Sequence, residues 1–177
     1  GIGALGADGK WLYSVNWAES KTLQIGPVRC EFELVYESWG GFGKERRHVT
    51  LDRGQSLARM VASFESVPEG VLVGPGLDIS AKRKHDGDTR FSAQDGWVSN
   101  FEPQDGADGS IMTAVALDPS VCPACVSMDG EGSLMLLSRP DAAKKSISYY
   151  AGANWTGQKR YLDADSWHRY VKDFAFG

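Results

Sequence analysis

The sequence predicts a mainly β protein, built as an antiparallel β-sandwich with one C-terminal helix. Several short segments alternate apolar and polar side chains, which is the pattern of half-buried strands. Turns rich in glycine separate these segments, and the chain holds 21 glycines in 177 residues. Only the C-terminal segment has helical spacing, so we expect about nine strands packed as two sheets.

The first half of the chain supplies four expected strands. Val28–Glu37 shows the pattern most clearly, because its even positions are apolar or aromatic while positions 29, 31, 33 and 37 are charged. The segment Trp39–Gly43 follows it as a glycine-rich turn. The four strands are expected at Lys10–Trp17, Val28–Glu37, Lys44–Arg53 and Leu57–Phe64, joined in antiparallel order by short turns.

The second half adds further extended segments. Val71–Arg83 should be extended, but Gly74-Pro75-Gly76 is expected to interrupt it, because these residues do not fit a regular central strand. Ile111–Leu117 is apolar on both faces, which predicts a central strand covered from both sides. Leu134–Leu137 and Ser146–Trp155 supply two more strands.

The C-terminal segment is predicted to be a helix that docks on a sheet. Asp163 or Asp165 can cap its first turn, and His168 is expected on its polar side, facing solvent. Four large apolar or aromatic residues fall at i, i+3, i+4 and i+7 on one face, namely Trp167, Tyr170, Val171 and Phe174.

Composition limits the class of protein. With 42% hydrophobic and 24% charged residues and no internal repeat or linker, residues 1–177 are expected to form a single β-sandwich domain. No apolar run approaches the roughly 20 residues of a spanning helix, so we expect no membrane partner. The net charge of −4 argues against nucleic acid as a partner, because binding to phosphates needs a basic face.

Three cysteines, Cys30, Cys122 and Cys125, give neither an even disulfide framework nor a full metal site. The spacing of Cys122 and Cys125 suits a short disulfide, a redox pair or half of a zinc site. A structural zinc site needs four ligands, and the sequence offers no second pair of cysteines or paired histidines. We therefore expect no metal and no cofactor.

The segment Ser80–Gln104 concentrates the chemistry of the chain. It is expected to fold back as two neighbouring strands that bring a basic cluster close to an aromatic and polar stretch. Such a basic cluster can hold one anionic group, such as a uronate carboxylate, a sulfate or a phosphate. The cluster is Lys82, Arg83, Lys84 and His85, and the stretch runs from Trp97 through Glu102 to Gln104.

A set of motifs resembles a bacterial family of domains of unknown function that is often found beside polysaccharide-degrading enzymes. The motifs are Leu5-Gly6, Gly26-Pro27-Val28-Arg29-x-x-Phe32-Glu33-Leu34-x-Tyr36, Lys84-His85, Gly96-Trp97 followed by Pro103-Gln104, Tyr149-Tyr150-Ala151-Gly152-Ala153-x-Trp155, and the segment Trp167–Phe174. The resemblance spans most of the chain. It covers the C-terminal half of that family's domain.

The resemblance implies a supersandwich-like fold, similar to galactose mutarotases and to the sandwich domains of polysaccharide lyases. It also implies a carbohydrate ligand. The chain opens on a glycine-rich segment without an initiator methionine or a visible signal peptide. We therefore expect the C-terminal portion of a longer domain, with an N-terminal half as a partner, in a periplasmic or secreted protein.

Several reactions fit the candidate residues. A lyase acting on a uronate polymer must neutralise the carboxylate, remove the neighbouring proton and protonate the leaving oxygen. Lys82, Lys84, Arg46 or Arg47 can neutralise, His85 can act as the base, and Tyr149 or Tyr150 as the acid. Tyr149 belongs to an apolar row of its strand, so Tyr150 is the better candidate.

An epimerase would instead use Glu102 and His85 on opposite sides of a sugar ring, and a hydrolase would need two carboxylates. Trp97 and Phe101 share one face of their strand, where they form either a sugar-stacking platform or part of a core. Gln104 and Arg46 are further candidates for contacts with the substrate. An enzyme of this kind is expected to carry its site on one concave sheet surface, formed by Lys84, His85, Trp97, Glu102, Gln104 and Tyr150. The alternative function is a carbohydrate-binding or structural β-sandwich module without catalysis.

Overall fold

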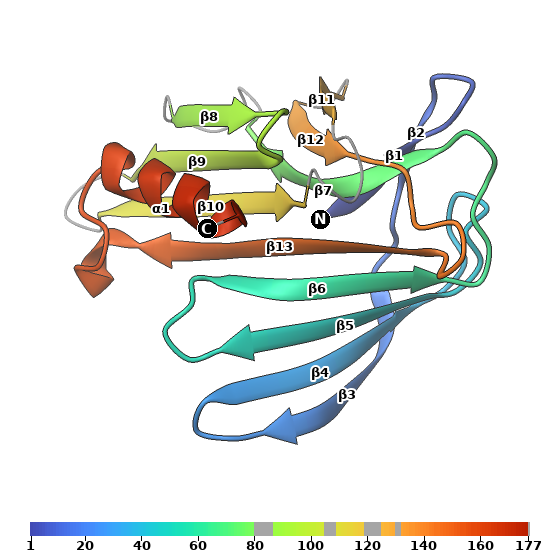
Figure 1. The fold of residues 1–177 in the computed structure, drawn as a ribbon, viewed down its shortest axis with the longest axis horizontal. Helices are drawn as coiled ribbons and strands as arrows, with labels where there is room; N and C mark the ends of the chain where they lie inside the picture. Colours follow the sequence, from blue (N-terminus) through green and yellow to red (C-terminus); the bar gives the residue numbers. More distant parts are fainter. Residues whose placement is uncertain (80–86, 105–108, 119–124, 130–131, 177) are drawn as a thin grey trace.

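Two antiparallel sheets face each other, and one helix packs on the far side of the larger sheet (Figure 1). This computed structural model describes residues 1–79, 87–104, 109–118, 125–129 and 132–176. The architecture confirms the predicted antiparallel sandwich with a C-terminal helix. We call the face of the larger sheet that contacts the smaller sheet the inner face, and the face under the helix the outer face.

The larger sheet has eight strands in the order β3-β4-β5-β6-β13-β10-β9-β8. Every neighbouring pair in it is antiparallel. Its strands are β3 (Trp17–Ile25), β4 (Arg29–Tyr36), β5 (Glu45–Asp52), β6 (Leu57–Phe64), β8 (Asp88–Ser92), β9 (Trp97–Pro103), β10 (Ser110–Leu117) and β13 (Ser146–Trp155). The pairing of β8 with β9 confirms the hairpin expected within residues 80–104.

The smaller sheet has five strands in the order β11-β12-β7-β1-β2. They are β1 (Ile2–Leu5), β2 (Trp11–Tyr13), β7 (Leu72–Asp78), β11 (Cys125–Met128) and β12 (Ser133–Leu137). Strand β1 pairs with β7, which lies about seventy residues later in the chain, from Ile2 opposite Pro75 to Leu5 opposite Leu72. The N-terminal strand is therefore fixed in the smaller sheet by a long-range pairing.

The expectation that Gly74-Pro75-Gly76 interrupts a strand is wrong, because β7 runs through all three residues between β12 and β1. A Cβ atom on Gly74 would lie 1.9 Å from the carbonyl oxygen of Leu136, and one on Gly76 would lie 2.1 Å from Met135 Sδ. The missing side chains thus let β12 approach closely. On the C-terminal side of Pro75, the residues from Gly76 to Asp78 pair regularly with β12. On its N-terminal side, Val73 forms a bridge with Ser138.

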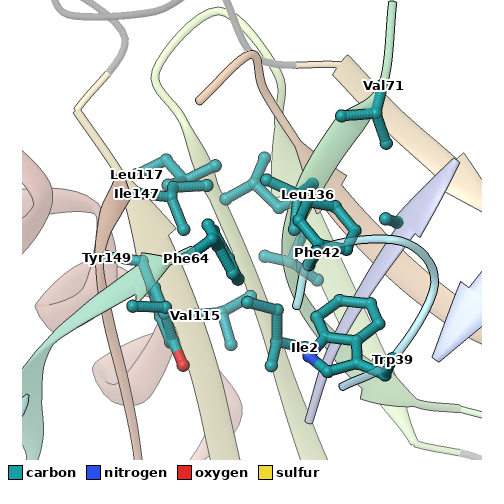
Figure 2. Packing of buried hydrophobic residues seen from close by; sticks show 14 of the residues in the cluster. Ile2, Trp39, Phe42, Phe64, Val71, Val115, Leu117, Leu136, Ile147 and Tyr149 are labelled. Atoms are coloured by element: carbon teal, nitrogen blue, oxygen red, sulfur yellow. The ribbon is translucent and has the colours of Figure 1, made fainter. Parts of the chain in front are cut away.

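The core between the sheets is built around three aromatic rings (Figure 2). Phe42 lies 4.5 Å from Trp39 and 4.7 Å from Phe64, measured between ring centroids. Gly40, Gly41 and Gly43 have positive φ angles, so the turn that carries Trp39 and Phe42 needs glycine at these positions. Apolar side chains from both sheets complete this core, including Ile2, Val71, Val115, Leu117, Leu136, Ile147 and Tyr149.

The second core lies between the outer face and helix α1 (Ala164–Phe176), which follows a short 3-10 helix, η1 (Thr156–Gln158). Figure 1 shows α1 crossing in front of β9 and β10. Trp167 and Val171 are fully buried against the sheet, as the helical spacing predicted. Strand β10 contributes Met112, Ala114 and Ala116 to this core and Val115 and Leu117 to the other, so it is covered from both sides as expected.

Asp163 caps α1. The backbone N–H of Ser166 donates to Asp163 Oδ1 at 2.7 Å, and the N–H of Asp163 donates to Ser166 Oγ at 3.3 Å, which forms a reciprocal capping box. Among the described residues, no helical segment combines the length and the apolar character needed to cross a bilayer.

Candidate functional site

A row of side chains crosses the outer face of the larger sheet. In the strand register, Trp97 lies opposite Ala116, Ala116 opposite Tyr150, and Tyr150 opposite Arg59. Directly opposite residues of antiparallel strands point to the same face, so all four share the face that carries α1. The row has a hollow near each end, one beside Tyr150 and one beside Trp97.

The first hollow, which we call the Tyr150 pocket, has a volume of about 400 Å³. This volume falls within the range of about 300–1,000 Å³ that is typical of small-molecule sites. The ring of Tyr150 stands edge-on to Phe174 of α1, with 5.0 Å between the centroids. The helix therefore positions one wall of the pocket.

Basic side chains gather in the Tyr150 pocket. Arg59 comes from β6, while Arg139 and Lys144 come from the connection between β12 and β13. Within the part of the chain that the structure describes, neither Arg59 nor Lys144 has a carboxylate at ion-pair distance. These two exposed cations can therefore serve an anionic ligand.

The rest of the pocket is mostly polar. Asp118 and Asp141 also line it, but Asp141 Oδ1 already accepts the backbone N–H groups of Ala143 and Lys144, each at 2.9 Å. The hydroxyl-bearing residues are Ser138, Ser146, Ser148 and Tyr150, beside the apolar Val61, Leu117 and Ile147. Hydroxyls above an apolar floor suit a ligand that carries both C–H and O–H groups.

The second hollow, which we call the His168 cleft, has a volume of about 290 Å³. It lies between the β8–β9 hairpin and α1. His168 is only 4% exposed, and its Nδ1 lies 2.5 Å from Ser99 Oγ. The cleft is lined by Arg90, Trp97, Asp165, His168, Arg169 and Lys172.

An ion network borders the His168 cleft. Arg90 donates two hydrogen bonds to Asp88, at 3.1 and 2.7 Å, and its Nη1 lies 2.8 Å from Asp165 Oδ1. Hydrogen bonding from Arg90 lowers the pKa of Asp88. Burial lowers the pKa of His168, and the nearby Asp88 offsets this effect only in part. His168 is therefore neutral at pH 7.

The expectation that His168 faces solvent is wrong. His168 precedes Val171 by three residues, so the two share a helix face, and Val171 is fully buried. Ser99 supplies a polar partner on the sheet for the imidazole. The spacing relative to Val171 was the signal in the sequence that could have placed His168 against β9.

The structure separates the predicted candidates on strand β9. Trp97 and Phe101 lie on the outer face and pack in the core under α1, where Trp97 is 7% exposed. The indole therefore packs under the helix, and its ring is not open as a stacking platform. Glu102 is directly opposite Ile111 and lies on the inner face, where it is 8% exposed. Gln104 follows β9, and its Nε2 donates to the carbonyl of Pro103.

The expected single surface that joins Glu102 with Trp97 and Tyr150 is thus wrong, because Glu102 projects from the opposite face of the sheet. The physical reason is the alternation of side chains along a strand, since Trp97 and Glu102 are an odd number of residues apart. Tyr149 and Tyr150 are adjacent in β13, so their side chains also point to opposite faces of the sheet. Tyr149 is buried in the core between the sheets, and burial raises its pKa.

The basic cluster proposed from the sequence, Lys82, Arg83, Lys84 and His85, lies outside the described residues, as does Cys122. The nearest described residue after the cluster is Gly87. A Cβ atom there would lie 2.7 Å from Asn100 Oδ1, so the chain re-enters the described structure beside β9.

The arginines of β5 are engaged in ion pairs outside both hollows. Arg46 is exposed and lies 2.9 Å from Glu33 Oε1. Arg47 is buried, its Nε donates to Glu45 Oε1 at 2.8 Å, and its guanidinium lies 4.3 Å from the centre of the Tyr36 ring. Arg59 of β6, which the sequence did not single out, lines the Tyr150 pocket.

No group of three or more histidine, cysteine, aspartate or glutamate side chains with metal-binding geometry occurs among the described residues. Cys30 is a half-buried free thiol on β4. The side chains that line the two hollows can form hydrogen bonds, neutralise charge and transfer protons through tyrosine or histidine.

Comparison with known proteins finds an uncharacterized relative and a distant structural similarity. The chain is 27% identical to the uncharacterized protein P7 of Formosa agariphila over 184 residues, which cover 99% of this chain and 44% of that protein. The chain thus spans less than half the length of this relative. A crystal structure of an alpha-galactosidase from Lactobacillus brevis aligns with 87% of this chain and 29% of its own, at 9% identity and a TM-score of 0.39.

A family model matches almost the whole chain, from residue 1 to residue 176. The chain therefore belongs to the family described as Domain of unknown function (DUF4861).

Proposed function

We propose that this chain is a carbohydrate-active β-sandwich that binds an acidic saccharide in the Tyr150 pocket. One observation carries the proposal. Arg59 and Lys144 converge on a pocket beside a tyrosine hydroxyl, and neither has a carboxylate partner among the described residues. A uronate carboxylate would pair with these cations, while the serine hydroxyls would bond the sugar hydroxyls.

The proposed reaction is β-elimination from a uronate. The cations of the pocket would stabilise the charge that develops on the uronate carboxylate as the proton on the adjacent carbon is removed. The electron pair of that C–H bond then forms a carbon–carbon double bond, and the bond to the glycosidic oxygen breaks. Tyr150 would protonate the leaving oxygen, and His85 is the proposed base.

Binding is tested with oligogalacturonate and with the same oligosaccharide after reduction of its carboxyl groups, by isothermal titration calorimetry. We expect the acidic form to bind and the reduced form to bind much more weakly. Replacing Arg59 by Gln should weaken binding of the acidic form by about 10- to 100-fold, because a charge-assisted hydrogen bond is lost. Arg53→Gln, at an exposed arginine outside the pocket, is the matched control and should bind normally. Equal binding of the two oligosaccharides would refute the proposed ligand class.

Catalysis is tested separately, from the ultraviolet absorbance of the unsaturated product. Tyr150→Phe should lower turnover by at least about a hundredfold, the usual contribution of a general acid, with affinity changed only a few-fold. Tyr149→Phe removes the same hydroxyl from the opposite face of the strand and should leave turnover unchanged. If the wild-type protein binds oligogalacturonate without any elimination, the chain acts as a binding module and the catalytic part of the proposal is wrong.

A further inference from the structure

Two buried N–H donors in the His168 cleft have no acceptor. Trp97 Nε1 and His168 Nε2 are both shielded from solvent and lack a hydrogen-bond partner in the structure. The side chains that carry them are only 7% and 4% exposed, and both line the same cleft. A buried donor without a partner costs about 1–3 kcal/mol, so such groups usually serve a ligand or an ordered water.

The tautomer of His168 follows from its neighbour on the sheet. Ser99 is fully buried, and its hydroxyl has His168 Nδ1 as its hydrogen-bond partner at 2.5 Å. If the hydroxyl donates to Nδ1, its proton is satisfied and the imidazole proton resides on Nε2. The Nε2 proton then faces Asp88 Oδ1 at 3.5 Å, which is too long for a good hydrogen bond.

The three cations that line the cleft, Arg90, Arg169 and Lys172, are paired to different degrees. Arg90 is already bound by the carboxylates of Asp88 and Asp165. Arg169 and Lys172 project from α1, and neither has a carboxylate at ion-pair distance among the residues that the structure describes. Arg169 acts on the Asp163 carboxylate only at longer range, and two cations outside any ion pair favour an anionic ligand.

We propose that the His168 cleft is a binding site for a monoanionic oxyanion group, either a carboxylate or a sulfate ester. Its oxygens accept the N–H groups of Trp97 and His168, and the guanidinium of Arg169 and the ammonium of Lys172 balance its charge. This site lies beyond the proposed function. It is separate from the Tyr150 pocket and shares none of its lining residues.

The test uses ¹⁵N-labelled protein and follows the indole N–H of Trp97 by NMR during titration with sodium acetate or sodium methyl sulfate. Trp97→Phe identifies the resonance, because it removes the indole N–H group and keeps an aromatic ring. We expect a saturable shift of this resonance with at least one of the two anions and none with sodium chloride at the same ionic strength. Acetate alone would define a carboxylate site, and methyl sulfate alone a sulfate-ester site.

The charge requirement is tested with the double variant Arg169→Gln/Lys172→Gln, whose exposed side chains can be replaced without disturbing the core. Its affinity for the effective anion should fall by about tenfold or more. The double variant Lys21→Gln/Arg53→Gln removes two exposed charges elsewhere and should bind like the wild type. A Trp97 shift that chloride reproduces, or that survives loss of Arg169 and Lys172, would overturn the proposal.

Discussion

Stability at mildly acidic pH should depend on one buried imidazole. Burial lowers the pKa of His168, so below pH of about 6.5 the unfolded chain binds a proton that the folded chain does not. This linkage makes the folded state less stable as the pH falls through this range. The charged groups that act on the imidazole are Asp88, Arg90 and Asp165.

Urea unfolding at pH 7 and pH 5 measures this effect. The wild-type protein should lose stability between the two values, and His168→Gln should lose less, because glutamine does not titrate. The two proteins are compared by the change in unfolding free energy between the two pH values. Their absolute stabilities are not compared, since His168→Gln also disturbs the hydrogen bond to Ser99. The same pH dependence in both proteins would show that His168 does not cause it.

Alternation along strands was enough to assign some residues to their faces, but not to define the site. It placed Tyr149 in the core and Tyr150 on the other face, and both assignments hold. The same rule assigns Glu102 and Trp97 to opposite faces of the sheet. The expectation that they share one surface was inconsistent with this rule. Arg59 was missed because its role depends on Tyr150 of β13, a strand about ninety residues later in the chain.

At the scale of elements, the N-terminal cap of α1 should contribute measurable stability. Asp163 accepts the N–H of Ser166 at 2.7 Å, and this bond lowers the pKa of Asp163. Asp163→Ala should lower the midpoint of thermal unfolding by a few degrees, because the first turn of the helix loses its cap. Asp173→Ala, in the last turns of the same helix, is the control and should not destabilise the protein, because a carboxylate there is unfavourable to the helix dipole. Equal losses in thermal unfolding would contradict the assigned cap.

Helix α1 should also control the Tyr150 pocket. Phe174 holds the ring of Tyr150 edge-on at 5.0 Å, and replacing it by Ala would leave Tyr150 free to change its rotamer. We expect Phe174→Ala to weaken binding of oligogalacturonate several-fold while the protein stays folded. Val171→Ala, in the middle of the same face, should instead lower stability by about 1–3 kcal/mol. Unchanged affinity in Phe174→Ala would mean that the helix does not position the tyrosine.

Strands whose side chains alternate regularly were predictable from the sequence. Strands that depend on contacts with distant parts of the chain were not. Leu57–Phe64 and Ser146–Trp155 are strands with the predicted bounds, because every second position of each carries an apolar or aromatic side chain. Strands β1 and β11 are short and carry too few residues to show a pattern. The continuity of strand β7 was not predictable, because its glycines are needed for the close approach of β12, a contact that the sequence does not reveal.

At the scale of the whole molecule, a buried ion pair joins the turn at residues 39–43 to the larger sheet. Glu45 is fully buried, accepts the indole N–H of Trp39 at 3.0 Å and pairs with Arg47. Glu45→Gln should lower the free energy of unfolding by about 3 kcal/mol or more, because it leaves the charge of Arg47 buried and unpaired.

The exposed pair of Glu33 and Arg46 in the same sheet supplies the control. Glu33→Gln should cost less than about 1 kcal/mol, since solvent screens this pair. Both variants are compared with the wild type by urea unfolding. If Glu45→Gln were no more destabilising than Glu33→Gln, the buried pair would not hold the sandwich together.

The arrangement of the sheets could not be derived from the sequence. The class of fold follows from local alternation, but the order of strands depends on pairings such as β1 with β7 and β6 with β13, which are distant in the chain. The smaller sheet covers only part of the inner face, and Ile111 and Trp155 remain 41% and 48% exposed there. The larger sheet therefore has exposed surface on both faces, and only the fold shows that Tyr150 and Glu102 lie on different ones.

A crystal structure of the protein with bound oligogalacturonate tests the central claim most directly, because it shows which face the saccharide occupies. We expect a uronate carboxylate within hydrogen-bond distance of Arg59 or Lys144, with the sugar beside the Tyr150 hydroxyl. A saccharide bound on the inner face beside Glu102 and Trp155, with none in the Tyr150 pocket, would contradict it.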